Sequence, residues 1–170
     1  MGAIPCGKVG KMTASLRKPD IQILESPSRI LAVVRRRAAL SEVPAVIPEA
    51  CGEVWKFLRA TALPHAGLNV VVYRHAHDQV FDLECGVEVL QAFEDTGAVV
   101  RSSTPAGLTA TAAHFGPYSE LLNTHAAIRT WCQAHGKVLA GVSWEVYGHW
   151  TDEPARLRTD VFYLLRDQVP

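Results

Sequence analysis

Hydrophobic positions recur along the chain with two spacings, and the changes between them divide it into strands and helices. Steps of three and four residues predict two amphipathic helices. Their apolar faces carry Ile47, Cys51, Val54 and Leu58 in the first, and Leu121, His125, Ile128 and Cys132 in the second. Apolar, β-branched runs of strand length predict strands. They lie at 29–35, 68–75, 80–90, 107–115, 142–149 and 157–165.

Proline and glycine mark the ends of these elements. Pro44 and Pro48 open the first helix, and Pro48 fits a first-turn position. Gly116 opens the second helix together with the proline that follows it, and Gly136 ends that helix. The stretch 94–105 contains Gly, Ser, Thr and Pro, and we interpret it as a join between two halves of the chain.

The second half of the chain repeats the first. Trp55 and Trp131 are separated by 76 residues, and Tyr73 and Tyr147 by 74 residues. Each half therefore reads strand, helix, hairpin. Because one such unit leaves apolar surface uncovered, we expect two units to share one sheet. The predicted fold class is α+β: duplicated β-α-β-β units form one antiparallel sheet, with two helices on one face and a ligand cleft on the other.

The expected domain organisation follows from this repeat. Residues 21–170 are predicted to form a single domain, with half-repeats at about 21–93 and 104–168. Residues 1–20 contain four basic side chains and are expected to form a flexible tail.

Charge and composition narrow the function classes. Lys and Arg together number 17, as do Asp and Glu, so the net charge is zero. The chain therefore lacks the excess of positive charge that is typical of nucleic-acid-binding domains, and we expect no direct DNA binding. No apolar run approaches the roughly 18 residues of a membrane span, and the N-terminal segment lacks the apolar stretch of a secretory signal. We therefore expect a cytoplasmic protein that does not bind membranes.

Cysteine and histidine spacing does not predict a metal site. The four cysteines are far apart in the chain and form no Cys-x-x-Cys pair, so we expect reduced, partly buried thiols. His75 and His77 could share a strand face, but no third ligand is spaced to join them. His125 and His135 are expected as hydrogen-bonded core imidazoles. We expect no metal and no cofactor.

Strand alternation identifies a candidate binding site. Ser143, Glu145 and Tyr147 share one side of their strand, and apolar side chains occupy the other. We expect the apolar side to meet the helices, which aims the polar side at the open face. Tyr73, from the repeat-related strand, is expected to join Glu145. A carboxylate among aromatic rings suits a cation, although Glu145 could instead be solvated on an exposed sheet face.

Other aromatic residues are further candidates. Trp55 lies beside the apolar stripe of its helix and is expected to reach the ligand, whereas Trp131 is expected in the core. Phe162 is a candidate ligand contact, but the run 161–165 is apolar throughout, so alternation does not assign its face. A serine hydrolase is not expected, because Gly-Val-Ser-Trp-Glu at 141–145 lacks the final glycine of a nucleophile elbow.

Two motifs carry a resemblance to a known family. The second half contains His114-x-Gly-Pro-Tyr-x-x-Leu121, followed by Trp-Glu-Val-Tyr at 144–147, and the first half contains Phe81-Asp-x-Glu-x-Gly-Val87. Together these resemble the GyrI-like (gyrase-inhibitor-like) effector-binding domains, from about Ile21 to Leu165. The last strand departs from the family, because Phe-Tyr-Leu-Leu stands where the family usually has Ile-Pro-Leu.

The resemblance implies a ligand cleft between the halves and a glutamate, matching Glu145, that meets bulky and often cationic aromatic molecules. Some relatives are the effector domains of AraC-type and MerR-type drug-sensing regulators. Here about twenty residues precede the first strand, too few for a three-helix DNA reader, and we expect a stand-alone binding protein. The alternative is a hydrolase of strained, cyclopropane-bearing DNA alkylators, in which Glu145 acts as a general base and Tyr147 assists.

Overall fold

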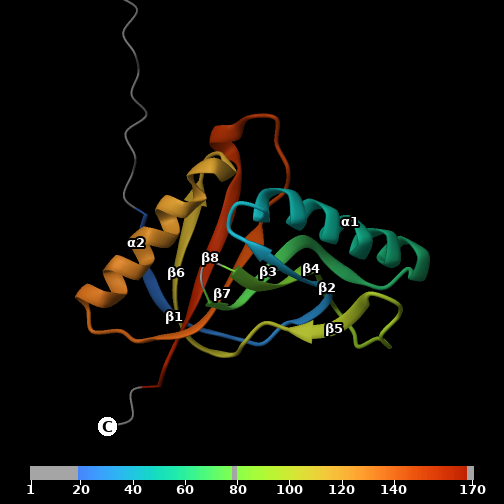
Figure 1. Cartoon of the computed structure of the whole chain (residues 1–170), viewed down its shortest axis with the longest axis horizontal. Helices are drawn as coiled ribbons and strands as arrows, with labels where there is room; N and C mark the ends of the chain where they lie inside the picture. The colour runs from blue at the N-terminus through green and yellow to red at the C-terminus, as the bar shows by residue number, and fades with distance from the viewer. Residues whose placement is uncertain (1–18, 78–79, 168–170) are drawn as a thin grey trace, which may run out of the picture.

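The computed structural model describes residues 19–77 and 80–167, in which eight strands and two long helices follow one another (Figure 1). The predicted tail lies outside the described residues except for its last two positions. The elements in chain order are β1 (Gln22–Ser26), β2 (Ile30–Ala39), α1 (Val43–Thr61), β3 (His65–His77), β4 (Val80–Val89), β5 (Val99–Ser103), β6 (Gly107–Phe115), the 3-10 turn η1 (Tyr118–Glu120), α2 (Leu121–Ala134), β7 (Leu139–Tyr147), the 3-10 turn η2 (Pro154–Arg156) and β8 (Arg158–Leu165).

All eight strands form one antiparallel sheet, in the order β1-β6-β8-β7-β3-β4-β2-β5. The two β-α-β-β units meet at the β3–β7 pair in the middle of this order, which confirms the predicted duplicated α+β fold. Val71 and Glu145 are direct partners in that central pair. They are also separated by the same 74 residues as Tyr73 and Tyr147, so the pseudo-twofold axis of the repeat passes beside Glu145.

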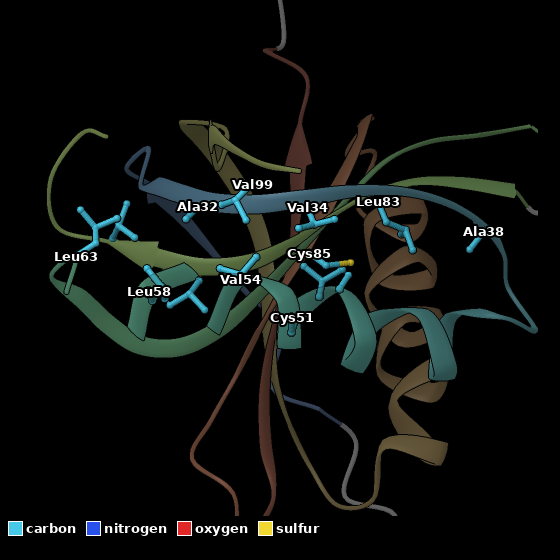
Figure 2. Close-up of a cluster of buried hydrophobic side chains, with 14 residues drawn as sticks. Ala32, Val34, Ala38, Cys51, Val54, Leu58, Leu63, Leu83, Cys85 and Val99 are labelled. Carbon is cyan, nitrogen blue, oxygen red and sulfur yellow. The ribbon is translucent and has the colours of Figure 1, made fainter. Parts of the chain in front are cut away.

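Each helix covers its own half of the sheet. In the first half, buried residues of α1 such as Cys51, Val54 and Leu58 pack on Val34 and Cys85 of the strands (Figure 2). In the second half, α2 packs in the same way on β6 and β8, with Ile128 and Cys132 against Ala110 and Val161. Trp55 and Trp131 lie at the edges of these two clusters, half-buried, as the repeat predicts.

Both helices lie on the same face of the sheet. Direct cross-strand partners point to one face, and one row of partners runs across the sheet through Val34, Cys85, Val71, Glu145, Val161 and Ala112. Residues of this row belong to the cluster under α1 and to the cluster under α2. The expected arrangement of two helices on one face is therefore confirmed.

Two short connections force the sheet to curl. Ser26 of β1 and Ile30 of β2 are only four residues apart, a reach of about 14 Å at most. A flat sheet would separate these two strands by six positions, or about 29 Å. The β5–β6 connection is equally short, and Thr104 ties the two together by accepting a hydrogen bond from the Arg29 backbone N–H at 2.9 Å.

The curl buries the face opposite the helices. Leu31, Val33, Val70, Val72 and Trp144 form a cluster there, each at most 3% exposed. The Trp144 ring stacks on that of Phe162, with centroids 5.2 Å apart. We expected this face to hold an open ligand cleft, lined by Glu145. That expectation was wrong for Glu145, because the curl makes this face a second apolar core and the side chain lies on the helix face.

The sequence patterns missed two short strands. β5 lies within the stretch interpreted as a join, and β1 precedes the first expected strand. Pro48 is inside α1 rather than in its first turn, where Pro44 lies instead. Since Pro48 is exposed, the hydrogen bond that its missing N–H would make is lost on the solvent side of the helix. The short link at 78–79 lies outside the described residues.

Candidate functional site

Glu145 is a buried carboxylate at the centre of the sheet. It lies on β7 beside the β3 partner strand, and its residue is 2% exposed. An ionised carboxylate so far from water is costly unless it is paired or hydrogen-bonded. The side chains around Glu145 therefore determine whether the carboxylate can stay charged and what it can bind.

Two tyrosines donate hydrogen bonds to the same oxygen of this carboxylate. Tyr73 and Tyr147 place their hydroxyls 2.8 Å and 2.5 Å from Oε2 of Glu145. Burial, followed by the negative charge of Glu145, raises the pKa of both tyrosines well above 10.0. Both hydroxyls are therefore protonated at neutral pH and act as donors. The repeat explains this convergence, because the two rings approach Glu145 from opposite sides of the pseudo-twofold axis.

The other oxygen of Glu145 is bound by a helix residue. Nε2 of His125, on α2, lies 2.7 Å from Oε1 of Glu145, and both side chains are at most 9% exposed. Since a carboxylate only accepts, Nε2 carries the proton. Nδ1 of His125 lies 2.8 Å from the Tyr163 hydroxyl, and that hydroxyl accepts a hydrogen bond from Arg129 at 2.9 Å. A hydrogen-bonded chain thus runs from exposed Arg129 to buried Glu145.

The Glu145 carboxylate, held by these donors, can compensate one positive charge on the helix face of the sheet. Glu145 is 2% exposed and both of its oxygens accept hydrogen bonds from protein donors, so a cation reaches the carboxylate only if a group that covers it moves. His125 is the donor carried by a helix, whereas the tyrosines belong to central strands. One side of the site is therefore formed by α2 and the other by the central strands.

The remaining predicted residues divide between the two faces. Ser143 is the cross-strand partner of Tyr73 on the helix face and is half-buried. Trp55 donates from Nε1 to Oδ1 of Asn69 at 2.8 Å and packs on the cluster under α1, but it has no hydrogen bond to Glu145. Phe162 lies on the opposite face in the stack with Trp144. The structure therefore brings Tyr73 and Tyr147 to Glu145, and separates Phe162 from them.

Three members of the network were not predicted as site residues. His125 was expected as a hydrogen-bonded core imidazole, which is confirmed, but its partner was not foreseen. Arg129 follows it by one helical turn, a spacing that places both on one face of α2. Tyr163 lies in the apolar run whose face alternation does not assign. His135 was expected in the core and is instead exposed, stacked on Trp131 with centroids 3.9 Å apart.

A second buried carboxylate lies on the opposite face. Glu84 is 5% exposed and is bound by Arg35, Arg74 and Ser102 at 3.1, 2.9 and 2.8 Å. Burial raises its pKa, but hydrogen bonds from Ser102 and Arg74 outweigh this and bring it below 4.5. Glu84 is thus neutralised by two arginines of the same chain whose side chains reach solvent, whereas the donors on Glu145 are tyrosines and one histidine.

Comparison with solved structures identifies several proteins of the same fold. The C-terminal domain of EcmrR matches with a TM-score of 0.73 and 19% identity, over 87% of this chain and 98% of that domain. In an EcmrR–DNA complex the match spans 57% of the EcmrR chain. SAV2435 bound to tetraphenylphosphonium matches with a TM-score of 0.65 and 8% identity, over 87% of this chain and 94% of SAV2435.

A hydrolase from Listeria innocua matches less well, with a TM-score of 0.55 and 12% identity over 88% of this chain and 93% of that one. The comparison with curated protein sequences gave no match. No helix within the described residues is long and apolar enough to cross a membrane.

The family comparison covers nearly all of the described residues. Residues 19–166 match the model of the GyrI-like small molecule binding domain. This range contains both β-α-β-β units, the central strand pair and the whole network around Glu145. The chain therefore belongs to the GyrI-like small molecule binding domain family.

Proposed function

We propose that this protein binds amphipathic aromatic cations, in drug or toxin sensing or sequestration, with Glu145 as the charge partner. The observation that carries the proposal is the nearly complete burial of this carboxylate among two tyrosines and a histidine. A buried carboxylate attracts a cation far more strongly than an exposed one, because little solvent screens the interaction. Adjacent aromatic faces add cation–π attraction.

The position of the network supports the same proposal. Tyr147 and Tyr73 pack against the cluster under α1, and His125 belongs to α2. A ligand at Glu145 would therefore lie between the two helix-covered halves. SAV2435, which shares the fold, was determined with a bound lipophilic aromatic cation, tetraphenylphosphonium. That compound is a suitable first probe for this chain.

The alternative is hydrolysis of a strained electrophile, with Glu145 as a general base and Tyr147 as a proton donor. A general base needs a free lone pair within hydrogen-bond reach of a water or substrate. The three donors on Glu145 fill all but one of its four lone-pair positions. The remaining position, on Oε1, keeps hydrolysis as the second candidate, and the match to a small molecule binding family favours binding.

The proposal is tested by titration calorimetry with tetraphenylphosphonium and with triphenylphosphine oxide, a neutral compound that keeps three of the four phenyl rings. We expect saturable one-to-one binding of the cation and much weaker binding of the neutral compound. Equal affinities for the two would contradict the proposal. Incubation with a cyclopropane-bearing DNA alkylator, followed by mass spectrometry, tests the alternative: sustained hydrolysis that Glu145→Gln abolishes would establish an enzyme.

A further inference from the structure

The hydroxyl of Thr159 is buried in the sheet near the candidate site. Thr159 lies on β8, is 0% exposed, and its Oγ1 has no hydrogen-bond partner within the described part of the chain. By contrast, the hydroxyl of the buried Thr111 donates to the carbonyl of Val161 at 2.8 Å. Burying an unpaired hydroxyl opposes folding, so its position in the molecule needs an explanation beyond packing.

The register places Thr159 beside the candidate site. It is the direct partner of Tyr147 on one side and of His114 on the other. This row lies on the helix face, adjacent to the row that contains Glu145 and Val161. Tyr147 follows Glu145 by two residues, a rise of about 7 Å along the strand. Thr159 is therefore the diagonal neighbour of Glu145 across the β7–β8 pair, a relation in which the two residues lie about 7–8 Å apart.

The polar side chains next to Thr159 form hydrogen bonds with other residues. The Tyr147 hydroxyl donates to Glu145. The two ring nitrogens of His114 are occupied by the Thr124 hydroxyl at 3.0 Å and the Pro117 carbonyl at 3.2 Å. Polar groups on both sides of Thr159 are thus satisfied without it, and its hydroxyl stays available to a group from outside the chain.

The same part of the protein covers Thr159 and the site. The ring of Tyr118, in η1, lies edge-on against that of Tyr147 with centroids 5.5 Å apart, and Tyr118 is 40% exposed. Thr124 and His125 are neighbours near the start of α2, and they contact the Thr159 row and Glu145 respectively. A movement of this segment that admits a cation to Glu145 would therefore also uncover Thr159.

We propose that Thr159 is a second polar contact for the ligand, which makes the site selective for aromatic cations that carry a hydroxyl, carbonyl or amino group about one ring away from the charge. This inference rests on the proposed function. Glu145 compensates the charge of the ligand, and Thr159 donates to or accepts from its polar substituent. The Thr159 hydroxyl, which has no partner among the described residues, then gains one in the complex.

The test compares tetraphenylphosphonium with (4-hydroxyphenyl)triphenylphosphonium, which adds one hydroxyl on one ring. We expect the wild type to bind the hydroxylated cation about three- to tenfold more tightly, the range of one hydrogen bond. Thr159→Val should remove this preference without changing the affinity for tetraphenylphosphonium, and Thr159→Ser should retain it. Denaturant unfolding serves as the folding check, and Thr159→Val should be at least as stable as the wild type because no hydrogen bond is lost.

Thr111→Val is the matched control. It also removes a buried threonine hydroxyl, but Thr111 lies on the opposite face of the sheet and its hydroxyl has a hydrogen-bond partner. It should lower stability and leave the ligand preference intact. A preference that persists in Thr159→Val, or a wild type that does not distinguish the two cations, would overturn the inference while the proposed function stands. If neither cation binds the wild type, the proposed function and this inference fail together.

Discussion

The Glu145 carboxylate is held by donors of two kinds: tyrosines fixed on central strands and a histidine on α2. Under the proposed function, a cation that approaches Glu145 from the side of α2 would displace the His125 imidazole from Oε1. Removing the imidazole therefore has opposite effects on folding and on binding. The tyrosine hydroxyls still satisfy the other oxygen.

His125→Leu is expected to lower the free energy of unfolding by about 1–3 kcal/mol, because a buried acceptor loses a donor. The same variant should bind tetraphenylphosphonium about tenfold more tightly, since the ligand no longer displaces His125. Calorimetry and urea unfolding measure the two effects. Arg129→Leu is the control, because Arg129 contacts Tyr163 rather than Glu145, and it should change the affinity little. Weaker binding by His125→Leu would mean that the histidine assists the ligand.

The buried thiols predict how stability depends on pH. Burial raises the pKa of the Cys51 thiol from 9.0 to about 12. The unfolded chain therefore loses this proton at lower pH than the folded protein does, and stability falls as pH rises from 9 toward 12. The slope is about 1.4 kcal/mol per pH unit for each such thiol. Urea unfolding between pH 8 and 11 should show this decline, and Cys51→Ala should make it shallower. An unchanged slope would show that Cys51 ionises normally.

At the residue scale, the sequence predicts which side chains of the site lie together on β7, but not which elements surround them. Alternation correctly places Ser143, Glu145 and Tyr147 on one side of a strand. It does not reveal which side faces the helices, because here both sides of the strand are buried. The partnership of His125 with Glu145 depends on how α2 lies over β7, and no local pattern in the sequence specifies that packing.

At the scale of elements, Gly86 of β4 shows how closely β2 and β4 approach. A Cβ at Gly86 would lie 1.8 Å from the backbone oxygen of Ala32, so only glycine fits without moving a strand. Gly52, inside α1, has nothing within 4 Å of the corresponding position. Substitution by alanine should therefore change the stability of the protein in opposite directions at the two glycines.

Gly86→Ala is expected to lower the free energy of unfolding by about 3 kcal/mol or more, because backbone atoms must separate. Gly52→Ala should raise it by about 0.5–1 kcal/mol, since alanine is the better helix former. Guanidinium unfolding of the two variants measures both changes. If Gly86→Ala is as stable as the wild type, the two strands are not in such close contact.

The longer elements were predictable because their patterns extend over many residues, as in the face of α1 from Ile47 to Leu58. β1 and β5 have only five residues each, and β5 reads Val-Val-Arg-Ser-Ser with just one buried position. They are strands because they pair at the two edges of a sheet formed by distant segments. That pairing depends on the tertiary structure.

At the scale of the whole molecule, we propose that residues 21–170 fold as one cooperative domain. The halves share the central β3–β7 pair, and Tyr73 of the first half bonds Glu145 of the second. The edge strands also tie the halves together, because β1 of the first half pairs with β6 of the second, and β5, which leads into β6, pairs with β2. Unfolding followed by tryptophan fluorescence and by far-UV circular dichroism should therefore give coincident transitions. Two separate transitions would indicate that the halves fold independently.

The central claim is that the charge of a bound cation is compensated by Glu145 on the helix face, and calorimetric titration of two matched variants with tetraphenylphosphonium tests it most directly. Glu145→Gln and Glu84→Gln each neutralise a carboxylate that is at most 5% exposed, on opposite faces of the same sheet. Glu145→Gln should weaken binding roughly 30- to several-thousand-fold, the usual effect of removing one member of a buried charge pair. Glu84→Gln should bind within about threefold of the wild type, although it loses internal ion pairs and stability. Equal affinities of Glu145→Gln and the wild type, or a larger loss in Glu84→Gln, would contradict this assignment.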